Sequence, residues 1–298
     1  MFEYKDLIKQ KLIREKTYNQ GPYKGLSVLK YTKKAFFGGI WDERLVECRG
    51  LVIDENKNII LYPFTKVFNF GEPGINKEKT LVDRDKKVIA INKINGFMAS
   101  ASLYNNELLV GTTGTLDSDF AKLAREELRK NTNVEDYLKL HTRDDEFTLM
   151  FEICHESDPH IIEEKLGVYL IGMRKNYISS RLVDEDVLDR EARKMGALRP
   201  NHYVGLFGDI KKRELLSKRE GAMIRDVDSG VHLCKLKSNY YKTKKFLMRG
   251  KGTIIWNHPQ RVDEDFVDVV DMLKTKYTQE QWEELDQFKR REILENMI

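Results

Sequence analysis

The stretch Ala90-Ile91-Asn92-Lys93-Ile94-Asn95-Gly96-Phe97-Met98-Ala99 places a lysine directly after an apolar run and three residues before a glycine. Lysine is among the side chains that are least often buried. When a lysine is desolvated beside other cations, its pKa falls and its amine can act as a nucleophile at neutral pH. Gly96 would also allow a phosphate to approach the backbone closely. Taken alone, the pattern is more typical of a surface lysine before a turn, so other segments must decide between the two interpretations.

The composition describes a chain of nearly balanced charge. Its 298 residues include 52 Lys and Arg against 48 Asp and Glu, which gives a formal net charge of +4. This excludes a polybasic coat for nucleic acid and leaves only a local basic patch for such a contact. Three cysteines without a CxxC pair indicate neither a disulfide framework nor a zinc knuckle. With no signal-like start and no long apolar run, we expect a cytoplasmic protein that does not enter a membrane.

Hydrophobic periodicity predicts an α+β fold with antiparallel sheets and flanking helices. Helical spacing is expected over residues 3–16, 117–140 and 184–195, the second helix carrying Phe120, Leu123, Ala124 and Leu128 on one face. Short apolar or alternating runs predict strands at residues 26–31, 50–53, 59–62, 88–91, 97–104, 107–110, 147–154, 168–173, 221–225 and 232–237. Asn105-Asn106 would join two of these strands as a hairpin.

After Trp256 the pattern becomes helical. Val262, Phe266, Val269, Val270 and Leu273 recur at helical spacing. Residues 278–281 have the form of a capping box. We therefore expect two domains, a mixed domain over residues 1–244 and a small helical domain over residues 245–298.

Several charged residues stand in or beside predicted strands. They are Arg49 and Lys66 before Lys93, and Glu152, Glu220, Lys235 and Lys237 after it. Residues two apart in a strand point to one side, so Lys235 and Lys237 would offer two ammonium groups to a polyphosphate. If they converged on Lys93, like-charge repulsion would lower the pKa of that lysine.

Each of these residues also has a simpler interpretation. Lys235 and Lys237 are equally compatible with the solvated face of an edge strand, and Arg49 with an ion pair to Glu47. Two strand carboxylates, Glu152 and Glu220, suit a hydrated magnesium ion, which prefers oxygen ligands. A transition-metal site is disfavoured, because Cys154 and His155 beside Glu152 are too few ligands at the wrong spacing.

The ordered set resembles the motifs of the covalent nucleotidyltransferases, specifically ATP-dependent RNA ligases of the kind that phages such as T4 use to repair cleaved tRNA. The resemblance covers about residues 48–241. Its motifs are, in order, Arg49-Gly50-Leu51-Val52-Ile53, Pro63-Phe64-x-Lys66-x-Phe68-Asn69, Lys93-x-Asn95-Gly96, Phe151-Glu152, residues 168–174, Glu220-Gly221 and Lys235-Leu236-Lys237-Ser238. The arginine and the Lys66 segment upstream of the nucleophile favour RNA ligases over DNA ligases and capping enzymes.

This resemblance implies an adenylyltransferase domain with Lys93 as the catalytic nucleophile, which would form a lysyl-AMP intermediate with ATP. Residues implied to bind the nucleotide are Arg49 and Lys66 at the triphosphate, Lys235 and Lys237 at the α-phosphate and leaving pyrophosphate, Phe68 beside the nucleotide, and Asn95, Gly96, Glu152, Glu220 and Gly221. Asn95, Glu152 and Glu220 are implied to hold Mg²⁺ or Mn²⁺ through water. Tyr169 is either an adenine-stacking aromatic or a core strand residue.

The implied partner is RNA with 3′-hydroxyl and 5′-phosphate ends, such as cleaved tRNA, with a separate kinase and phosphatase healing the ends. Lys242, Lys244, Lys245, Arg249 and Lys251 lead into the C-terminal helices. They indicate either contacts to RNA phosphates or a buttress against the core.

The chain departs from the pattern at two positions, because Asn95 stands where relatives commonly carry Asp and Thr113 where they often carry a basic residue. The alternative functions are a DNA ligase, an mRNA capping guanylyltransferase, or a non-catalytic module that binds RNA ends. Asn95 favours the last, whereas the joint presence of Lys93, the two glutamates and the two strand lysines argues against it.

Overall fold

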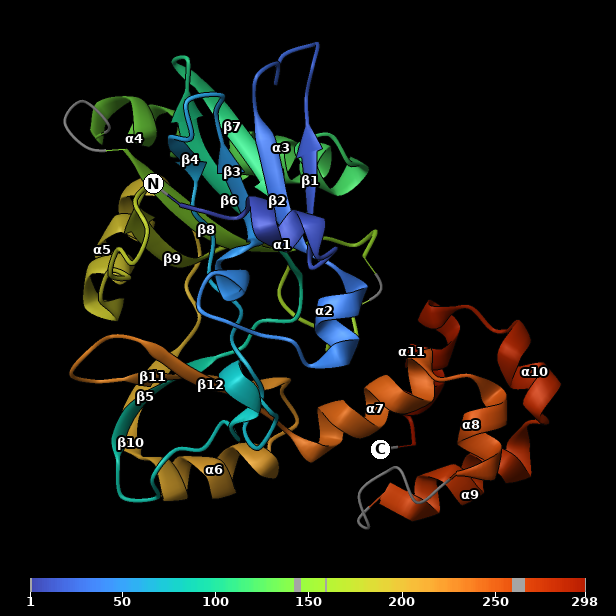
Figure 1. The fold of residues 1–298 in the computed structure, drawn as a ribbon. Coiled ribbons are helices and arrows are strands. Elements are labelled where there is room, and N and C mark those ends of the chain that lie inside the picture. The colour runs from blue at the N-terminus through green and yellow to red at the C-terminus, as the bar shows by residue number, and fades with distance from the viewer. Residues whose placement is uncertain (1, 142–145, 159, 259–265, 298) are drawn as a thin grey trace.

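The computed structural model describes residues 2–141, 146–158, 160–258 and 266–297. Within these ranges the chain forms three four-stranded sheets with helices around them (Figure 1). Every pairing between neighbouring strands of these sheets is antiparallel. This confirms the predicted α+β class.

The first sheet has the order β1-β2-β3-β4. Its strands are β1 (Ile13–Thr17), β2 (Ser27–Tyr31), β3 (Arg49–Ile53) and β4 (Ile59–Leu61). Leu29, Leu51 and Ile53 bury one face of this sheet against the N-terminal helix and the segment that carries Phe68. The strand that begins at Arg49 is therefore held by a packed core.

The second sheet has the order β7-β6-β8-β9 and the third the order β10-β5-β11-β12. The strands of the second sheet are β6 (Phe97–Tyr104), β7 (Glu107–Thr112), β8 (Phe147–Cys154) and β9 (Gly167–Lys175). The strands of the third sheet are β5 (Lys87–Asn92), β10 (His202–Leu206), β11 (Gly221–Asp226) and β12 (His232–Lys237). The predicted hairpin at Asn105-Asn106 is confirmed, and both residues have positive φ, as a two-residue hairpin turn requires.

The helices cover the sheets and build a separate cluster. They are α1 (Lys5–Lys9), α2 (Lys33–Gly38), α3 (Asp119–Asn131), α4 (Val134–His141), α5 (Glu185–Met195), α6 (Phe207–Leu215), α7 (Asn239–Arg249), α8 (Gly252–Asn257), α9 (Val267–Lys276), α10 (Gln279–Glu284) and α11 (Gln287–Glu295). Helices α3, α4 and α5 pack on the second sheet through residues such as Leu128, Leu138 and Leu188. Helix α6 packs on the third sheet through Phe207 and Ile210.

The C-terminal helices α7 to α11 lie together beside the sheets (Figure 1), and their apolar side chains form a cluster of their own. Trp282, Leu247 and Val270 lie at its centre, and the predicted capping box from Thr278 to Gln281 is confirmed. Val262, which the pattern placed on a helix, lies outside the described residues. The domain boundary at residue 245 stays a prediction, and α7 runs across it.

Two predicted elements differ from the structure. The first helix does not extend over residues 3–16, because Lys11 adopts a left-handed conformation after α1 and Ile13 begins a strand paired with β2. The helix predicted over 117–140 is two helices, since the Thr132 hydroxyl donates to the Leu128 carbonyl oxygen where α3 ends. Helix α2, strand β10 and helix α6 were not predicted. Within the described part of the chain, no helix is both long enough and apolar enough to cross a bilayer.

Candidate active site

Lys93 lies at the crossing point between two sheets. It follows β5 of the third sheet and precedes β6 of the second. The Lys93 backbone N–H donates to the Gly221 carbonyl oxygen over 2.9 Å, and the Gly96 N–H donates to Glu152 Oε1 over 3.1 Å. Both ends of the connecting loop are thus fixed, and the lysine faces a cavity of about 500 Å³ that residues of both sheets line.

The Lys93 ammonium is paired with acids. Its Nζ lies 3.2 Å from Glu220 Oε1. Burial lowers the pKa of Lys93, but the carboxylates of Glu220 and Glu152 outweigh that effect, so the pKa is raised. The expectation that neighbouring lysines would lower this pKa is therefore wrong for the protein alone, because the nearest charges are negative.

Asn95 is tied into the site by both ends of its amide. Its Oδ1 accepts from the backbone N–H groups of Ile161 and Ile162 over 2.8 and 3.0 Å, and its Nδ2 donates to Glu220 Oε2 over 2.6 Å. Two donors at one end fix which atom is the oxygen, because an NH₂ group cannot accept them. The amide oxygen is thus already engaged, and the structure does not offer it as a metal ligand.

Three carboxylates gather beside Lys93, and sequence reasoning named only two of them. Glu164 Oε1 accepts from the Asn95 backbone N–H over 3.2 Å. Burial and the neighbouring acids raise the pKa of both Glu152 and Glu164. Burial also raises the pKa of Glu220, but Lys93 and Lys237 outweigh it and lower that pKa. Two buried carboxylates and one half-buried carboxylate that repel one another fit a hydrated divalent cation.

Cations surround the other side of the cavity. Arg49 and Lys235 line it, and Lys237 Nζ lies 3.6 Å from Glu220 Oε1. Burial, together with Arg49, Lys66, Lys93 and Lys237, lowers the pKa of Lys235 to about 6. Burial also lowers the pKa of Lys237, to about 8. The predicted convergence of Arg49, Lys235 and Lys237 near Lys93 is what the geometry shows.

Lys66 and Phe68 belong to an aromatic cage. Lys66 is 9% exposed, and its Nζ lies 4.3 Å from the ring centroid of Phe68 and 5.3 Å from that of Trp41. Phe68 packs edge-on against Trp41 in the core of the first sheet. Phe68 therefore supports Lys66 and is not on the cavity wall, where the sequence interpretation placed it beside the nucleotide.

The two glycines have structural roles. A side chain at Gly96 would clash with the Ile153 carbonyl oxygen, and one at Gly221 with that of Leu236. Gly221 also has φ +130°, which other residues rarely adopt. Tyr169 is buried and donates to the Lys165 carbonyl oxygen, so it is a strand residue of β9, while Ile171 of the same strand lines the cavity.

Sequence reasoning missed several residues that the fold brings to the site. The cavity wall includes Met223, Phe120 and His232. Phe120 was expected on the core face of a helix, but it is 46% exposed and packs edge-on against Phe97. Burial and nearby cations lower the pKa of His232 to about 3, so its imidazole is neutral. The alternating pattern of β11 could have predicted that Met223 faces the cavity. No local sequence pattern indicated that Phe120 or His232 belongs to the site.

A cation also stands near Thr113. The Nζ of Lys30, on β2, lies 3.0 Å from the position that a Cβ atom on Gly114 would occupy. Burial and the charges of Arg14 and Arg49 lower the pKa of Lys30. Position 113 itself carries no basic residue, but Lys30 supplies a positive charge beside the next residue from another strand.

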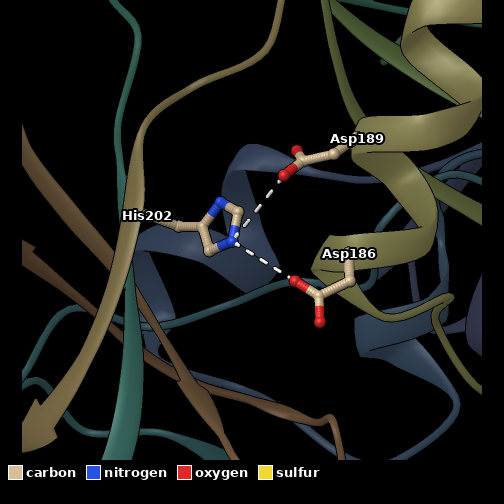
Figure 2. Close-up of side chains that lie close together, drawn as sticks. All are labelled: Asp186, Asp189 and His202. Carbon is tan, nitrogen blue, oxygen red and sulfur yellow. Dashed lines mark ion pairs between the residues drawn. The ribbon is translucent and has the colours of Figure 1, made fainter.

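A separate group of possible metal ligands lies on α5 and β10. His202 Nε2 is 4.0 Å from both Asp186 Oδ1 and Asp189 Oδ2 (Figure 2). Asp189 also accepts from Arg199 Nε over 2.8 Å, and the Asp186 side chain is 93% exposed. These contacts are explained by a surface ion-pair network.

Comparison with known proteins gives a consistent result. A family model described as RNA ligase matches residues 47–246. RNA ligase 1 of bacteriophage TS2126 is 28% identical over 137 residues, which are 43% of this chain and 34% of that protein, so the match spans about a third of the relative's length.

Two solved structures share the fold. An archaeal ATP-dependent RNA ligase (form 2) has a TM-score of 0.59 at 15% identity, covering 99% of this chain and 75% of its own. A putative ATP-dependent DNA ligase from Aquifex aeolicus has a TM-score of 0.57 at 14% identity, covering 96% and 75%. At these identities the two structures show a common fold and nothing about substrate.

Proposed function

The chain belongs to the RNA ligase family, and on that premise we propose that it is an ATP-dependent RNA ligase that acts through a covalent lysyl-AMP intermediate. The observation that carries the proposal is the placement of Lys93 near two groups of opposite charge. Glu220 and Glu152 lie beside its ammonium group, and Arg49 and Lys235 line the same cavity. Attack of an amine on ATP needs cations that neutralise the triphosphate, and carboxylates beside the amine are the groups that would hold a divalent cation there.

In the first step, the neutral amine of Lys93 attacks the α-phosphorus of ATP. A phosphorus–nitrogen bond forms and the nitrogen releases one proton to water, the bond to the bridging oxygen breaks, and pyrophosphate leaves with its electron pair. Arg49, Lys235 and Lys237 neutralise the charge that develops on the leaving group. Lys66, held in its aromatic cage, adds to the positive potential at Lys235.

Before this step the Lys93 ammonium must give up a proton that its acidic neighbours stabilise. Glu152 and Glu220, with Glu164 beside them, are the residues that would hold a hydrated Mg²⁺ or Mn²⁺ ion. Such an ion supplies positive charge that competes with Lys93 for these carboxylates and thereby favours the neutral amine. Asn95 keeps Glu220 oriented through its NH₂ group.

Two further steps complete the proposed reaction. An oxygen of an RNA 5′-phosphate attacks the phosphorus of lysyl-AMP, and the phosphorus–nitrogen bond breaks to restore the amine of Lys93. A 3′-hydroxyl then attacks the activated 5′-phosphate and AMP leaves. The family supports RNA as the acceptor. Cleaved tRNA as the natural RNA, and healing of its ends by a kinase and phosphatase, are finer proposals that rest on the resemblance alone.

Intact mass of the purified protein, incubated with ATP and magnesium before any RNA is added, tests the covalent step. We expect a gain of one AMP that disappears in Lys93→Ala. The matched control is Lys87→Ala, because Lys87 is an exposed lysine on the strand that leads to Lys93 and its loss should leave the adduct unchanged. A gain with GTP only would replace the ligase by a guanylyltransferase, and no gain with either nucleotide would contradict the proposal. Transfer of the AMP to matched RNA and DNA ends then separates RNA ligation from DNA ligation.

A further inference from the structure

A second cavity shares Lys235 with the nucleotide cavity. Its volume is about 670 Å³. We define the basic groove as this second cavity, formed by α6, β12 and α7. Six of its lining residues are cations and none is acidic: Lys211, Lys235, Lys237, Lys242, Lys245 and Arg249. In a chain with 52 basic and 48 acidic residues, this local excess of positive charge is unusual.

Helix α7 separates two roles for its basic residues. Lys242, Lys245 and Arg249 are exposed and fall at helical spacing on one face, which lines the groove. Lys244, by contrast, is 2% exposed and pairs with Glu295 over 2.9 Å, so it holds α7 against α11. The exposed residues Lys242 and Lys245 are therefore available for RNA contact, whereas Lys244 supports the packing of the helix against the rest of the module.

Three of the groove lysines have no internal ion pair among the described residues, whereas Lys237 pairs with Glu220. Among the residues that the structure describes, no carboxylate lies within 4.0 Å of the ammonium group of Lys211, Lys242 or Lys245. Lys211 Nζ lies 4.5 Å from the ring centroid of Phe70, and Lys245 Nζ lies 5.8 Å from that of Tyr241. Aromatic rings interleaved with cations are typical of surfaces that bind single-stranded nucleic acid, where bases stack and phosphates are neutralised.

Resting on the proposed function, we propose that the basic groove binds the phosphodiester backbone of a single RNA strand and leads its end to Lys93. The strand would enter over Lys242 and Lys245 on α7, pass Lys211 on α6, and reach Lys237 and Lys235. Of these two, Lys235 also lines the nucleotide cavity. Lys211, Lys242 and Lys245 do not line the nucleotide cavity, so we expect the adenylylation of Lys93 not to depend on them. Binding is sequence-independent, because the contacts go to phosphates and ring faces.

The test compares two triple variants of the full chain. Lys211→Gln/Lys242→Gln/Lys245→Gln removes the outer cations, and Lys9→Gln/Lys24→Gln/Lys130→Gln removes three exposed lysines that do not line the groove. The first readout is the affinity for a 5′-phosphorylated single-stranded RNA of about 12 nucleotides, measured between about 50 and 200 mM salt. The second is intact-mass adenylylation with ATP in the absence of RNA.

For the groove variant we expect at least about tenfold weaker RNA binding, with a salt slope smaller by about 2, since each lost phosphate contact contributes about 0.7. Its adenylylation should equal that of the unmodified protein, and the control triple should match that protein in both readouts. Unchanged RNA affinity and slope in the groove variant would overturn the inference. So would a parallel loss of adenylylation, because it would place these cations at the triphosphate. If the unmodified protein is not adenylylated at all, the proposed function fails, while the RNA-binding readout still decides on the groove.

Discussion

The Asn95 side-chain amide forms hydrogen bonds both to Glu220 and to the segment at Ile161 and Ile162, which packs against the C-terminal helices. Its Nδ2 lies 2.6 Å from Glu220 Oε2, and its Oδ1 accepts from the N–H groups of Ile161 and Ile162. Those two isoleucines belong to the apolar cluster of the C-terminal helices, with Leu247 and Trp282. The loop that carries Lys93 is therefore connected to the helical module through a single neutral side chain.

Asn95→Asp should make the protein depend on divalent metal for stability. The new carboxylate keeps the acceptor for Ile161 and Ile162, but it faces Glu220 without a donor, and like charges at that distance repel. We expect the thermal midpoint to fall by several degrees when EDTA is present, corresponding to about 1–3 kcal/mol. Added Mg²⁺ should restore most of the loss.

The control for this experiment is Asn95→Ala. It removes both the donor and the acceptor, so its loss of stability should be insensitive to Mg²⁺. If Asn95→Asp melts at the same temperature as the unmodified protein in EDTA, the hydrogen bond to Glu220 does not contribute as argued.

Lys93 should react slowly with amine reagents in the protein alone. The carboxylates of Glu220 and Glu152 raise its pKa, so a smaller fraction is neutral at any pH below that value. Acylation by a small ester at pH 8 to 9, followed by peptide mass spectrometry, should modify exposed Lys87 faster than Lys93. In Glu220→Gln the pKa of Lys93 falls and its acylation should accelerate severalfold, whereas Lys87 should not change. Equal rates for both lysines in the unmodified protein would refute the ion pair.

Most strands of the site were predictable from sequence because their residues carry local information. β3, β5, β6, β8, β11 and β12 each show an apolar or alternating run. The motifs place Arg49, Glu152 and Lys235 on these strands, and Lys93 and Glu220 directly beside β5 and β11. A strand buried on both faces, such as β8, is recognisable without knowing its partners.

Sequence could not predict features that depend on how the sheets meet. Helix α2 is short, and its Phe36 and Phe37 stay exposed, so no periodicity marks it. Strand β10 carries alternating exposure on an edge and has a glycine inside it. The raised pKa of Lys93 follows from carboxylates that lie 59 and 127 positions further along the chain, at Glu152 and Glu220, and no local pattern reports that proximity.

Binding of a polyphosphate should be accompanied by proton uptake near neutral pH. The pKa of Lys235 is lowered to about 6 in the protein alone, so the side chain is mostly neutral at pH 7. A bound phosphate chain raises that pKa, and the lysine takes up close to one proton. Titration calorimetry with pyrophosphate at pH 7, in two buffers of different ionisation enthalpy, measures this number directly.

The uptake should disappear at pH 5, where Lys235 is already charged, and in Lys235→Met. Lys237, whose pKa is lowered to about 8, is mostly charged at pH 7 and adds only a small fraction of a proton. An uptake that persists unchanged in Lys235→Met would assign the titration to another group.

Lys235→Met should also stabilise the fold while weakening adenylylation. The folded-state pKa of Lys235 lies below the value of about 10.4 expected in the unfolded chain, so the unfolded state binds the proton more tightly. The lysine is therefore destabilising at any pH below the unfolded value, and the penalty grows as the pH falls toward 6 and is constant below that. Each unit of pKa shift corresponds to about 1.4 kcal/mol, so we expect Lys235→Met to raise the free energy of unfolding by more than about 1 kcal/mol at pH 6 and by little near pH 10.

Adenylylation should fall by about a hundredfold, the loss typical of removing one group that stabilises developing charge. Chemical denaturation at both pH values checks the first effect, with Lys87→Met as the control that should show no such pH dependence. A variant that is less stable than the unmodified protein at pH 6 would mean that Lys235 gains more from its surroundings than burial and four neighbouring cations take away.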